Sequence, residues 1–413
     1  MKKILQFKLK LLAQLYVWRY RPRVIGITGS VGKTSVKEAI GLVLKDKFKI
    51  RISAKSYNNQ IGFPLTILGF ETAGRNILGW LVIFLKALGK IIYDPNHPQI
   101  LVLEMGSDKI SDLNYLVSIV KPDIAVITNV GPVHLQAFKD LKGVAKEKSV
   151  LVKNIKKNGW AVLNYDDEYV RAMANKTNAK KIFYGLSQSA EVRADKIKII
   201  DKNLIFNIHI NNQLYNFHLR GIGEHLVYTI LAAFSVAEIL KIESKHIIAS
   251  LTRFQPLPGR GRFLEGENNN LIIDESYNAS PMSVAGALKF LEKIKTNKQK
   301  VVILGDMREL GEKSFEFHQD LAAKISFANK IILVGSEIKG TYDKILNKTK
   351  NIFYFKNAEE LDKKLSQLIK SDNLVLVKGS QAIRLEKIVA KLISSRYNKR
   401  EVLVRQDNEW QNK

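Results

Sequence analysis

The stretch ITGSVGKTSVKEA, residues 27–39, has the residue types and spacing of a phosphate-binding loop. Gly29 and Gly32 would let the backbone approach an anion closely, and the N–H groups of a following helix would point at it. Lys33 would place a positive charge at the β- and γ-phosphates, and Thr34 would offer a hydroxyl to Mg²⁺. The loop therefore predicts a site for a nucleoside triphosphate with magnesium, formed by Gly29, Ser30, Gly32, Lys33, Thr34 and Ser35.

The segments around this loop are those that such a site requires. Residues 24–27 are apolar and β-branched, as in a buried strand, and apolar residues recur at helical spacing from Thr34 to Leu44. Strand, glycine turn and helix together give the motif its meaning. The loop is the shorter form T-G-x-x-G-K-T-S, since Ile27 stands where the standard pattern has its first glycine. The alternative is a glycine turn with a chance lysine, which would not explain the flanking elements.

Polar residues also follow later apolar strands, in LVLEMG and TNVGPVHL. Ligands of open α/β sheets bind beyond the carboxyl ends of the strands, so Glu104 is placed to hold the Mg²⁺ of the nucleotide. Asn129 and His134 follow the strand over residues 124–128, and His134 either contacts a metal or substrate or is structural. Lys148 in GVAKEKSVLV either points inward, where it would need a partner or a modification, or lies on the surface.

Composition limits the class of protein. The 413 residues are 46% hydrophobic and 25% charged, as in a globular protein of two or three domains. There is no cysteine, which excludes disulfides, zinc–thiolate sites and a catalytic thiol. The net charge of +27 favours an anionic partner, although lysines spread along the whole chain are equally typical of a lysine-rich proteome. No nucleic-acid-binding module is recognisable, so nucleic acid is the disfavoured partner.

Two apolar segments could contact a membrane or a partner protein. Residues 1–22 form a basic amphipathic pattern with Tyr16 and Trp18 near its end, and lysines interrupt its apolar run, so it does not resemble a signal peptide. Residues 77–92 are apolar but contain Lys86 and Lys90. Neither segment reaches the ~20 apolar residues that span a bilayer. We expect both to pack on protein, with a membrane surface as the alternative, in a cytoplasmic protein.

Strand-like and helix-like segments alternate in both halves of the chain, which predicts α/β domains with mainly parallel sheets. Residues 196–220 instead alternate apolar and polar side chains around Asn211-Asn212, which indicates a hairpin or meander. FQPLPGRGRF, residues 254–263, marks a boundary. We predict a basic helix over 1–22, a P-loop domain over 23–258 and a Rossmann-like domain over 259–413, with a frayed polar tail after Ser394.

The second domain has charged, glycine-containing loops after three strands, in DESYNASP, LGDMRELGEKS and VKGSQAIRLE. Any one loop could be a plain turn, but three at strand ends predict one rim that faces one cleft. Two arginines lie near the boundary, Arg260 and Arg262. The candidate residues of the rim and boundary are Arg262, Asp274, Asp306, Arg308, Glu309, Lys378, Ser380 and Arg384.

Taken in order, these motifs resemble those of the Mur ligases, the ATP-dependent amide-forming enzymes of peptidoglycan synthesis. TGSVGKTS, LEMG, TNVGPVHL, GEHLVYTILAA and PGRGRF are similar to the family's motifs and occur in family order. YNNQIGFPLT, DESYNASP, LGDMRELGEKSFEFH and KGSQAIRLE resemble the member that adds D-alanyl-D-alanine to UDP-N-acetylmuramoyl-tripeptide. The resemblance covers residues 24–395.

The resemblance implies that ATP converts a substrate carboxylate to an acyl phosphate, which an amine then attacks. Lys33 would stabilise the transferring phosphoryl group. Thr34 and Glu104 would hold one Mg²⁺, and His134 would help to hold a second. Lys148 matches the position that the family carbamylates, which turns a cation into a metal-bridging carboxylate.

The resemblance also implies roles for the second domain. Arg262 and Asp274 would meet the phosphates and ribose of the nucleotide, while the loops at Asp306 and Lys378 would shape the site of the incoming amine. The two domains would close to assemble the site. Asn129 would contact the nucleotide, and the residues expected to contact substrate are Asn58, Asn59, Asp306, Arg308, Glu309, Lys378, Ser380 and Arg384.

Two departures from the family pattern affect these expectations. The typical member begins with a domain that grips the UDP-sugar, whereas here only the basic helix precedes the P-loop strand at Val24. The basic helix, residues 77–92 or a partner protein would then recognise the carrier. The family also has asparagine after the histidine of GEH and again three residues later, where this chain has Leu226 and Thr229, so the contacts to adenine are expected to differ.

Three functions stay open. The YNNQIG and DMRELG loops favour the D-alanyl-D-alanine-adding ligase. The early P-loop favours a Mur-like ligase that acts on another carboxylate, such as a polyglutamate or lipid-linked substrate, and the zinc-ribbon type of that group is disfavoured by the lack of cysteine. The third function, from another class, is a P-loop NTPase that binds nucleic acid.

Overall fold

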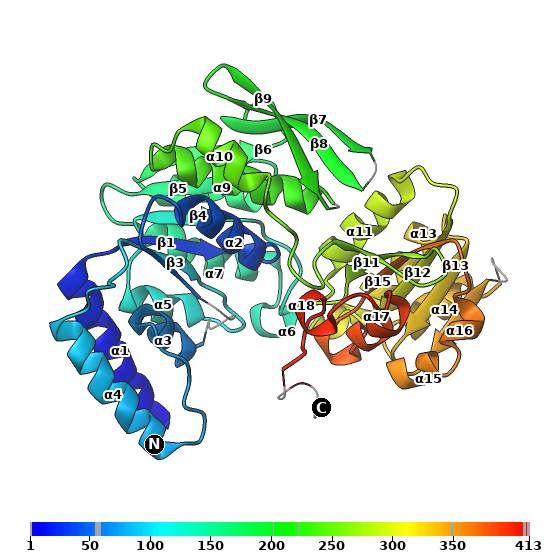
Figure 1. The fold of residues 1–413 in the computed structure, drawn as a ribbon, viewed down its shortest axis with the longest axis horizontal. Coiled ribbons are helices and arrows are strands. Elements are labelled where there is room, and N and C mark those ends of the chain that lie inside the picture. The colour runs from blue at the N-terminus through cyan, green and yellow to red at the C-terminus, as the bar shows by residue number, and fades with distance from the viewer. Residues whose placement is uncertain are drawn as a thin grey trace.

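Two α/β halves, each built on its own sheet, lie side by side (Figure 1). The computed structural model describes residues 2–53, 59–200, 202–221, 223–347, 351–407 and 410. The predicted fold class is confirmed: a P-loop half with a mainly parallel sheet is followed by a second α/β half with a Rossmann-like arrangement.

The first sheet has nine strands in the order β2-β3-β1-β4-β5-β6-β7-β8-β9. Its strands are β1 (Arg23–Thr28), β2 (Ile50–Ile52), β3 (Ile100–Glu104), β4 (Ile124–Ile127), β5 (Trp160–Asn164), β6 (Lys180–Gly185), β7 (Val192–Ile200), β8 (Asn203–Ile210) and β9 (Gln213–Arg220). Pairing is parallel from β2 to β7 and antiparallel from β7 to β9. Because β1 lies between β3 and β4, the loops that follow these three strands meet at one edge of the sheet.

Helices cover both faces of this sheet. They are α1 (Lys2–Tyr20), α2 (Lys33–Leu44), α3 (Gly62–Leu68), α4 (Ile77–Ile92), α5 (Asp112–Ile119), α6 (Leu135–Phe138), α7 (Leu141–Lys153), α8 (Glu168–Ala172), α9 (Glu224–Ile239) and α10 (Ser244–Leu251), with a 3₁₀ turn at Met173–Lys176. One core lies between the sheet and α2, α9 and α10. The other lies between the opposite face and α1, α3, α5 and α7.

The predicted meander is confirmed. β8 and β9 form an antiparallel hairpin whose two turn residues are Asn211 and Asn212, with φ of 48° and 61°. A two-residue turn with both φ values positive matches the right-handed twist of its strands, and asparagine tolerates this conformation. The hairpin projects beyond the parallel part of the sheet (Figure 1).

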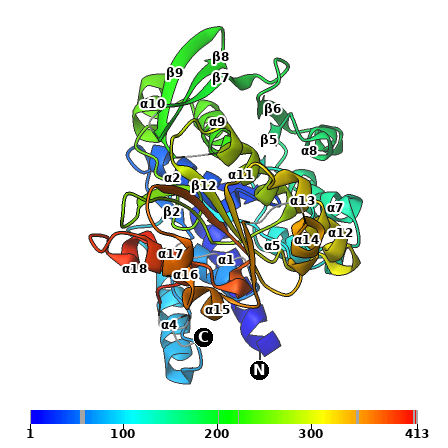
Figure 2. The same cartoon turned by 90° about the vertical axis from the view of Figure 1, so that its right-hand side faces the viewer.

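Helices α1 and α4 run side by side and project from the first half (Figures 1 and 2). One side of α1 is buried through Leu9, Leu12, Ala13 and Tyr16. The Tyr16 hydroxyl donates to Asp94 Oδ2 at 2.7 Å, and the Tyr20 hydroxyl donates to the carbonyl of Lys90 at 2.8 Å. The expected packing on protein is therefore present. Among the described residues, no helix combines the length and apolarity needed to cross a bilayer.

The second sheet has six strands in the order β10-β11-β15-β12-β13-β14. They are β10 (Arg262–Glu265), β11 (Leu271–Glu275), β12 (Gln299–Gly305), β13 (Lys330–Val334), β14 (Ile352–Phe355) and β15 (Asn373–Lys378). Only β10 is antiparallel to its neighbour. The three strands that precede the predicted rim, β11, β15 and β12, are adjacent, so their end loops lie together as expected.

The helices of this half are α11 (Pro281–Lys293), α12 (Ser314–Gln319), α13 (Leu321–Lys324), α14 (Lys339–Ile345), α15 (Ala358–Asp362), α16 (Leu365–Leu368), α17 (Glu386–Leu392) and α18 (Lys399–Val402), with 3₁₀ turns at Gly311–Lys313 and Gln381–Ile383. α11 begins with a capping box, since the side chains of Ser280 and Ser283 each bond the other's backbone N–H. Residues 252–261 connect the halves, and we keep the proposed boundary at 258/259 within this connection.

The expectation of a frayed tail after Ser394 is wrong for the residues that are described there. Arg405 is buried, and its guanidinium bonds Glu386 at 3.0 Å and the backbone carbonyls of Ser276 and Tyr277. A charge that is paired and hydrogen-bonded in this way ties the tail to the loop after β11. The sequence around Arg405 is polar, and composition alone does not show such a partner.

Candidate active site

The loop after β1 has the backbone shape of an anion cradle. Gly29 has a φ of +149° and Gly32 a φ of +87°, a region that residues with a side chain rarely adopt. A Cβ on Gly29 would also collide with the hydroxyl of Thr128. Gly32 is the cap residue of α2, so the first N–H groups of that helix are directed toward the loop.

The loop after β4 braces this cradle. Asn129 Oδ1 accepts from the N–H of Val31 at 2.9 Å, and its Nδ2 donates to the carbonyl of Val31 at 3.0 Å. The Ser30 hydroxyl donates to the Gly131 carbonyl and accepts from the Gly131 N–H. Asn129 and Ser30 thus fix the conformation of the cradle, and direct contact of Asn129 with a nucleotide stays a prediction.

Two lysines of the cradle region repel each other. Lys33 folds back on its own loop, where its Nζ donates to the carbonyls of Gly29 at 2.8 Å and Ser30 at 3.2 Å, and burial lowers its pKa. Lys148 of α7 is buried, as one of the two sequence readings expected, and burial together with the nearby charge of Lys33 lowers its pKa to about 7. The negative charge of the adjacent Glu147, whose two oxygens accept from the N–H groups of Ser111 and Leu113, raises the pKa of Lys148 but is outweighed by burial and Lys33.

Two further side chains line the same cavity as the cradle, and each lies in a segment at or after the end of a strand. Glu104 ends β3 and is buried, and its Oε2 has no hydrogen-bond partner among the described residues. His134 has a φ of +51° and caps the short α6. Its Nδ1 lies 2.5 Å from Glu309 Oε2 of the second half, and its Nε2 lies 3.4 Å from Asp108 Oδ1. The bond from His134 lowers the pKa of Glu309.

The second half meets the cradle through Arg260 rather than Arg262. The Arg260 guanidinium lies 3.7 Å from the centroid of the Tyr277 ring and donates to the hydroxyl of Thr34 at 3.2 Å. Arg262 instead donates to the carbonyls of Pro256 at 2.6 Å and Glu401 at 3.4 Å. The guanidinium of the second half that contacts the cradle is therefore that of Arg260, and contact of Arg262 with a phosphate stays a prediction.

Asp274 likewise holds the connection between the halves. It is buried, Oδ2 accepts from the Gly259 N–H at 3.0 Å, and Oδ1 accepts from the hydroxyl and N–H of Ser276. Burial raises its pKa. These bonds fix the turn that carries Arg260, and Asp274 does not line the cavity.

The loop after β12 is joined to the loop after β13 by the Asp306 side chain and to the loop after β15 by Ser380. The Asp306 side chain accepts from the N–H groups of Ser336 and Ile338, and Arg308 bonds Asp306 Oδ2 at 2.9 Å and Glu337 Oε1 at 2.8 Å. The Ser380 hydroxyl accepts from the N–H of Arg308 at 2.9 Å. Asp306 is therefore a buried anchor, while Arg308 and Ser380 reach the cavity.

Lys378 forms a buried ion pair that the sequence reading did not anticipate. Its Nζ donates to Glu275 Oε2 at 2.8 Å and to the carbonyl of Asn278 at 3.0 Å. Burial alone would raise the pKa of Glu275, but the ammonium of Lys378 holds it below its ordinary value. His225 lies 4.0 Å from the other oxygen of Glu275, and burial lowers the pKa of His225.

Many of these groups line one cavity of ≈ 1010 Å³ between the two halves, which is large for a single ligand. The predicted site residues that line it are Ser30, Gly32, Lys33, Thr34, Ser35, Glu104, Asn129, His134, Arg308, Glu309, Lys378 and Ser380. Those described but not lining it are Gly29, Lys148, Arg262, Asp274, Asp306, Arg384 and Asn59.

Two of the residues that do not line the cavity make contacts elsewhere. Asn59 caps α3, accepting from the N–H groups of Ile61 and Gly62, and Arg384 bonds Glu386 at 2.5 Å. Asn58 lies outside the described residues.

The sequence of each half matches a known domain family. The model of the Mur ligase middle domain matches residues 27–237, and that of the Mur ligase glutamate ligase domain matches residues 259–381. The UDP-N-acetylmuramoyl-tripeptide–D-alanyl-D-alanine ligase of Rickettsia prowazekii (strain Madrid E) is 30% identical over 375 residues, which cover 89% of this chain and 78% of that protein. The chain belongs to the Mur ligase family.

Other relatives and solved structures agree with this assignment. The ligase of the same name from Bacillus subtilis (strain 168) is 27% identical over 394 residues, covering 94% of this chain and 79% of its own length. A MurF ligase from Thermotoga maritima in complex with ADP superposes with a TM-score of 0.80 at 25% identity, covering 96% of this chain and 84% of that one. Folylpolyglutamate synthase from Thermotoga maritima shares the fold, with a TM-score of 0.61 at 15% identity.

The residues of this Mur ligase fit magnesium only together with a phosphate ligand. Within the part of the chain that is described, no group of three or more histidine, aspartate or glutamate side chains could hold a metal ion. The unpartnered oxygen of Glu104 and the hydroxyl of Thr34 are hard oxygen donors, and Mg²⁺ is commonly held by one or two carboxylates with substrate phosphates. Glu104 and Thr34 are thus a suitable protein contribution to such a site.

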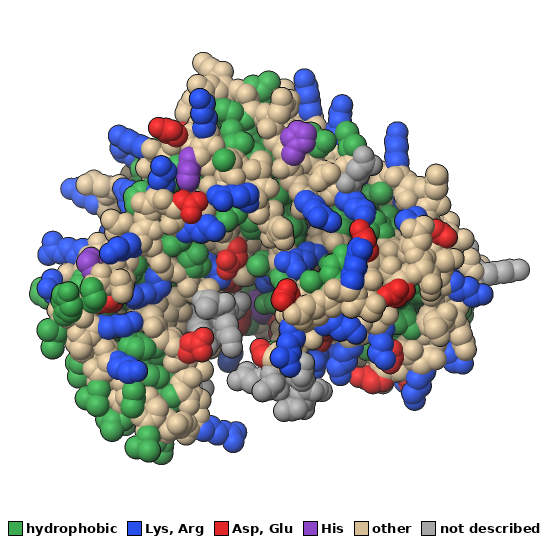
Figure 3. Space-filling model, in the orientation of Figure 1, with side chains coloured by type: hydrophobic (Ala, Val, Ile, Leu, Met, Phe, Trp, Pro, Cys, Tyr) green, Lys and Arg blue, Asp and Glu red, His purple; other side chains and the backbone are tan. Residues whose placement is uncertain are grey.

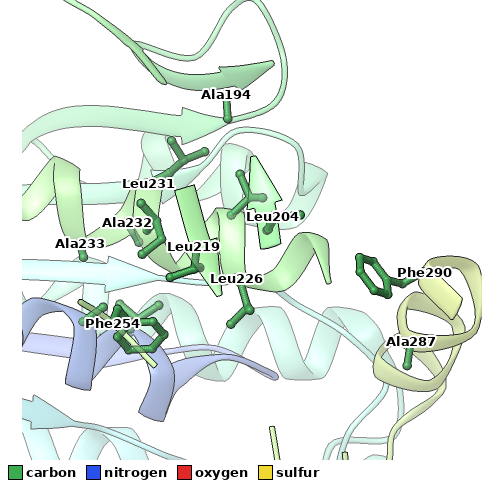
Figure 4. Packing of buried hydrophobic residues seen from close by; sticks show 14 of the residues in the cluster. Ala194, Leu204, Leu219, Leu226, Leu231, Ala232, Ala233, Phe254, Ala287 and Phe290 are labelled. Atoms are coloured by element: carbon green, nitrogen blue, oxygen red, sulfur yellow. The ribbon is translucent and has the colours of Figure 1, made fainter. Parts of the chain in front are cut away.

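The two departures from the family's asparagines have different consequences. Leu226 is fully buried and lies in the core with Leu219 of β9 and Phe254 (Figure 4). Thr229 lines the cavity, with its hydroxyl bonded to the His225 carbonyl at 2.8 Å. Tyr228 also lines the cavity, and its hydroxyl donates to Asp166 Oδ2 at 2.9 Å. Thr229, Tyr228 and Asp166 are therefore polar groups of the cavity beside α9.

Sequence reasoning missed several lining residues. Glu275 directly follows Asp274, and His225 stands in the quoted GEH motif, so both were within reach of the motif search. Tyr277 stands in the quoted DESYNASP loop, whereas Asp108 lies in a loop without a distinctive pattern. Only the fold brings these four residues to the cavity.

The depressed pKa of Lys148 makes stability depend on pH. The folded chain holds this lysine at a pKa of about 7 against an ordinary value of 10.5, so the unfolded chain binds more protons between these values. The free energy of unfolding then gains up to about 1.4 kcal/mol per pH unit from this group as the pH rises from 7. In bicarbonate-free buffer, we expect Lys148→Met to be more stable than wild type at pH 7, with a difference that shrinks toward pH 10.

Urea unfolding at a series of pH values measures this difference. Lys146→Met is the matched control, because Lys146 is exposed on the same helix. A stability difference between Lys148→Met and wild type that stays constant with pH would contradict the depressed pKa.

Proposed function

We propose that this Mur ligase forms an amide bond between UDP-N-acetylmuramoyl-tripeptide and D-alanyl-D-alanine, with conversion of ATP to ADP and phosphate. The observation that carries the proposal is the pairing of two sets of groups across one cavity. The phosphate cradle of the first half faces Arg308, Ser380 and the Lys378–Glu275 pair of the second half. The 30% identity to the Rickettsia prowazekii ligase over 89% of the chain supports these substrates.

In the first step, a carboxylate oxygen of the tripeptide attacks the γ-phosphorus of ATP, and ADP leaves. Lys33 now donates to carbonyls of its own loop, and on ATP binding its ammonium would turn to the β- and γ-phosphates. Arg260 reaches the cradle at Thr34 and would add positive charge beside the transferring phosphoryl group. The ADP held by the Thermotoga maritima relative supports nucleotide binding at this place.

In the second step, the amine of D-alanyl-D-alanine attacks the acyl carbon, and phosphate leaves from the tetrahedral intermediate. Arg308 is half-exposed at the cavity, and its guanidinium could pair with the terminal carboxylate of the dipeptide. The attacking amine must be unprotonated. His225 has a lowered pKa and is therefore mainly neutral near pH 7, so it is a group in this cavity able to accept that proton.

Magnesium and a modified Lys148 complete the proposed site. Bound Mg²⁺ would neutralise charge on the phosphates, with Thr34 and Glu104 as its protein ligands. Lys148 is buried and has a pKa of about 7, so part of it is the neutral amine that adds to CO₂ with loss of a proton. The resulting carbamate would carry a negative charge near Lys33, in place of a cation that Lys33 repels.

The soluble nucleotide substrates place the reaction in the cytoplasm. The exposed surfaces of α1 and α4 lie outside the reaction proposed here. The alternative is a ligase that acts on a polyglutamate or lipid-linked carboxylate. The product assay described next distinguishes the two.

A product assay by mass spectrometry tests the proposal. The purified chain is mixed with Mg-ATP, UDP-N-acetylmuramoyl-tripeptide and D-alanyl-D-alanine, and each component is omitted in turn. We expect a pentapeptide product with an equal amount of ADP, and neither in any omission. ATP binding without product would refute the choice of carboxylate, and a failure to bind ATP would refute the ligase mechanism itself.

Substitution of Arg260 should mainly lower activity, whereas substitution of Arg262 should mainly lower stability. Arg260→Ala removes a cation that touches the cradle, so we expect kcat to fall about 10²-fold with little change in the urea midpoint. Arg262→Ala removes hydrogen bonds to two backbone carbonyls, so we expect a loss of about 1–3 kcal/mol of stability with a smaller effect on kcat. ADP release and urea unfolding of both variants measure this. The reverse pattern would restore Arg262 as the phosphate-binding residue.

Replacement of Lys148 tests the carbamate. We expect Lys148→Ala to lose at least about 10²-fold in rate, because the site loses a negative group beside the phosphates. Added acetate or propionate should restore part of the rate by supplying a carboxylate in the space left by the side chain. Lys146→Ala, on the exposed side of the same helix, should keep full activity without added acid. Full activity of Lys148→Ala would exclude the carbamate.

A further inference from the structure

Exposed apolar side chains are concentrated on two helices far from the cavity. Nineteen large hydrophobic residues are exposed among those described, and five lie on α1 and seven on α4. Single exposed apolar residues are common on soluble proteins, but a contiguous patch usually has a partner. Figure 3 shows these side chains gathered over the end of the molecule formed by α1 and α4. We call this surface the apolar face; its members are Ile4, Phe7, Leu11, Leu15, Trp18, Ile77, Leu78, Leu81, Val82, Leu85, Leu88 and Ile92.

Helix α1 is apolar on two opposite sides. Leu9, Leu12, Ala13 and Tyr16 are buried against the domain. The five exposed apolar residues of α1 recur every three or four positions, from residue 4 to residue 18, and therefore form one stripe on the outer side. The inner stripe is sufficient to pack the helix, so packing on the described residues does not account for the outer stripe.

Helix α4 has the same arrangement. Ile83 and Ala87 are buried, whereas residues 78, 81, 85, 88 and 92 recur at helical spacing on the exposed side. The Lys8 ammonium of α1 lies 5.9 Å from the centroid of the Phe84 ring of α4, so the helices are neighbours along their length. Trp18 is 71% exposed and Tyr93 is 74% exposed, at the same end of the pair.

Both helices are held rigidly by the domain. The Gln14 side chain donates to the Ser118 carbonyl at 2.8 Å, and Asp94 receives the Tyr16 hydroxyl and lies 3.5 Å from Arg51. With these attachments and its length below a bilayer span, the pair can meet a flat surface only along its side.

The charged side chains of the two helices are all positive. Residues 2–37 and 72–93 contain no aspartate or glutamate. Lys3, Lys8, Arg19, Arg75 and Lys86 are exposed on or next to the two helices. Lysine and arginine can keep their charge in the headgroup layer while their alkyl stems follow the apolar residues inward.

We propose that α1 and α4 bind the surface of an anionic lipid bilayer and lie in its plane, with the apolar face among the upper acyl chains. The cations beside the face pair with lipid phosphates, and Trp18 and Tyr93 lie at the headgroup level. A second copy of this chain is a poorer occupant, since symmetric contact would bring lysines against lysines with no carboxylate from either pair of helices.

Vesicle flotation of the full chain tests this proposal. Vesicles of phosphatidylcholine alone are compared with an equimolar mixture of phosphatidylcholine and phosphatidylglycerol, at low and at high salt. We expect the chain to float with the anionic vesicles, and to float less as salt rises because salt screens the attraction. Flotation with neither kind of vesicle would overturn the proposal, and equal flotation with both would overturn its electrostatic part.

Matched variants connect binding to the apolar face. Phe7→Ser, Leu81→Ser and Leu85→Ser are combined in one variant, and Ile200→Ser, Leu214→Ser and Leu346→Ser in a control that changes equally exposed residues elsewhere. We expect at least about tenfold weaker vesicle binding for the first and no change for the second. Equal effects of both variants, or none from the first, would overturn the proposal.

Charge-reversal variants test the lipid headgroup contact. Lys3→Glu, Lys8→Glu and Lys86→Glu are compared with Lys157→Glu, Lys198→Glu and Lys295→Glu, which make the same change of net charge on other exposed surfaces. We expect about tenfold or greater weakening for the first set alone. An unchanged urea unfolding midpoint shows that each variant is folded. If wild type does not float but forms a dimer, and the triple serine variant on the apolar face is a monomer, the face is assigned to a second copy of this chain.

Discussion

Contacts across the domain junction hold this site together, among them the hydrogen bond from Arg260 to Thr34 and the 2.5 Å contact between Glu309 Oε2 and His134 Nδ1. Each joins a residue of the phosphate loop's half to a residue of the second half. Without them the cradle and the rim would be two separate, solvated surfaces. With them, the groups between the halves are buried, where charges act more strongly than in water. Lys33 lines this junction, and burial lowers its pKa.

The same closure gathers more positive than negative charge around the cradle. The nearby charge of Arg260 lowers the pKa of Lys33, and the charge of Lys33 lowers the pKa of Lys148. Glu104 and Asp108 offset this only in part. A polyphosphate would satisfy all three cations at once, so its binding should favour the closed arrangement over an open one. The unpartnered oxygen of Glu104 then serves a cation that accompanies the phosphates, rather than the lysines themselves.

The sequence predicted those parts of the site that depend on local structure. The cradle follows from glycine spacing between a strand and a helix, and the positions of Glu104 and the rim follow from the rule that parallel strands end at one edge. Arg260 could not be distinguished from Arg262 in this way. Glycines at 259 and 261, with φ of +69° and +90°, turn the chain just before β10, and this turn depends on Asp274 from another strand. Contacts between the halves, such as Glu309 to His134, have no signature in either segment.

Residues 1–22 show a second limit of sequence patterns. Periodicity identified the helix, but a helix with apolar stripes on two opposite sides does not reveal which stripe packs on the domain. The fold decides this through Tyr16, whose hydroxyl bonds the buried Asp94 and turns the Leu9 side inward. The outer stripe therefore remains exposed. It could be recognised as a surface only after the inner stripe was known to pack on the domain.

The position of α1 and α4 separates their exposed face from the chemistry. α1 ends at Tyr20, directly before β1 begins at Arg23, and α4 ends shortly before β3 begins at Ile100. These two strands pair in parallel, and their opposite ends carry the phosphate loop and Glu104. The helices are therefore attached where the central strands start, and the cavity opens where they finish. A bilayer against the apolar face would leave the cavity accessible to soluble nucleotides, so membrane attachment and ligase activity are compatible in one closed structure.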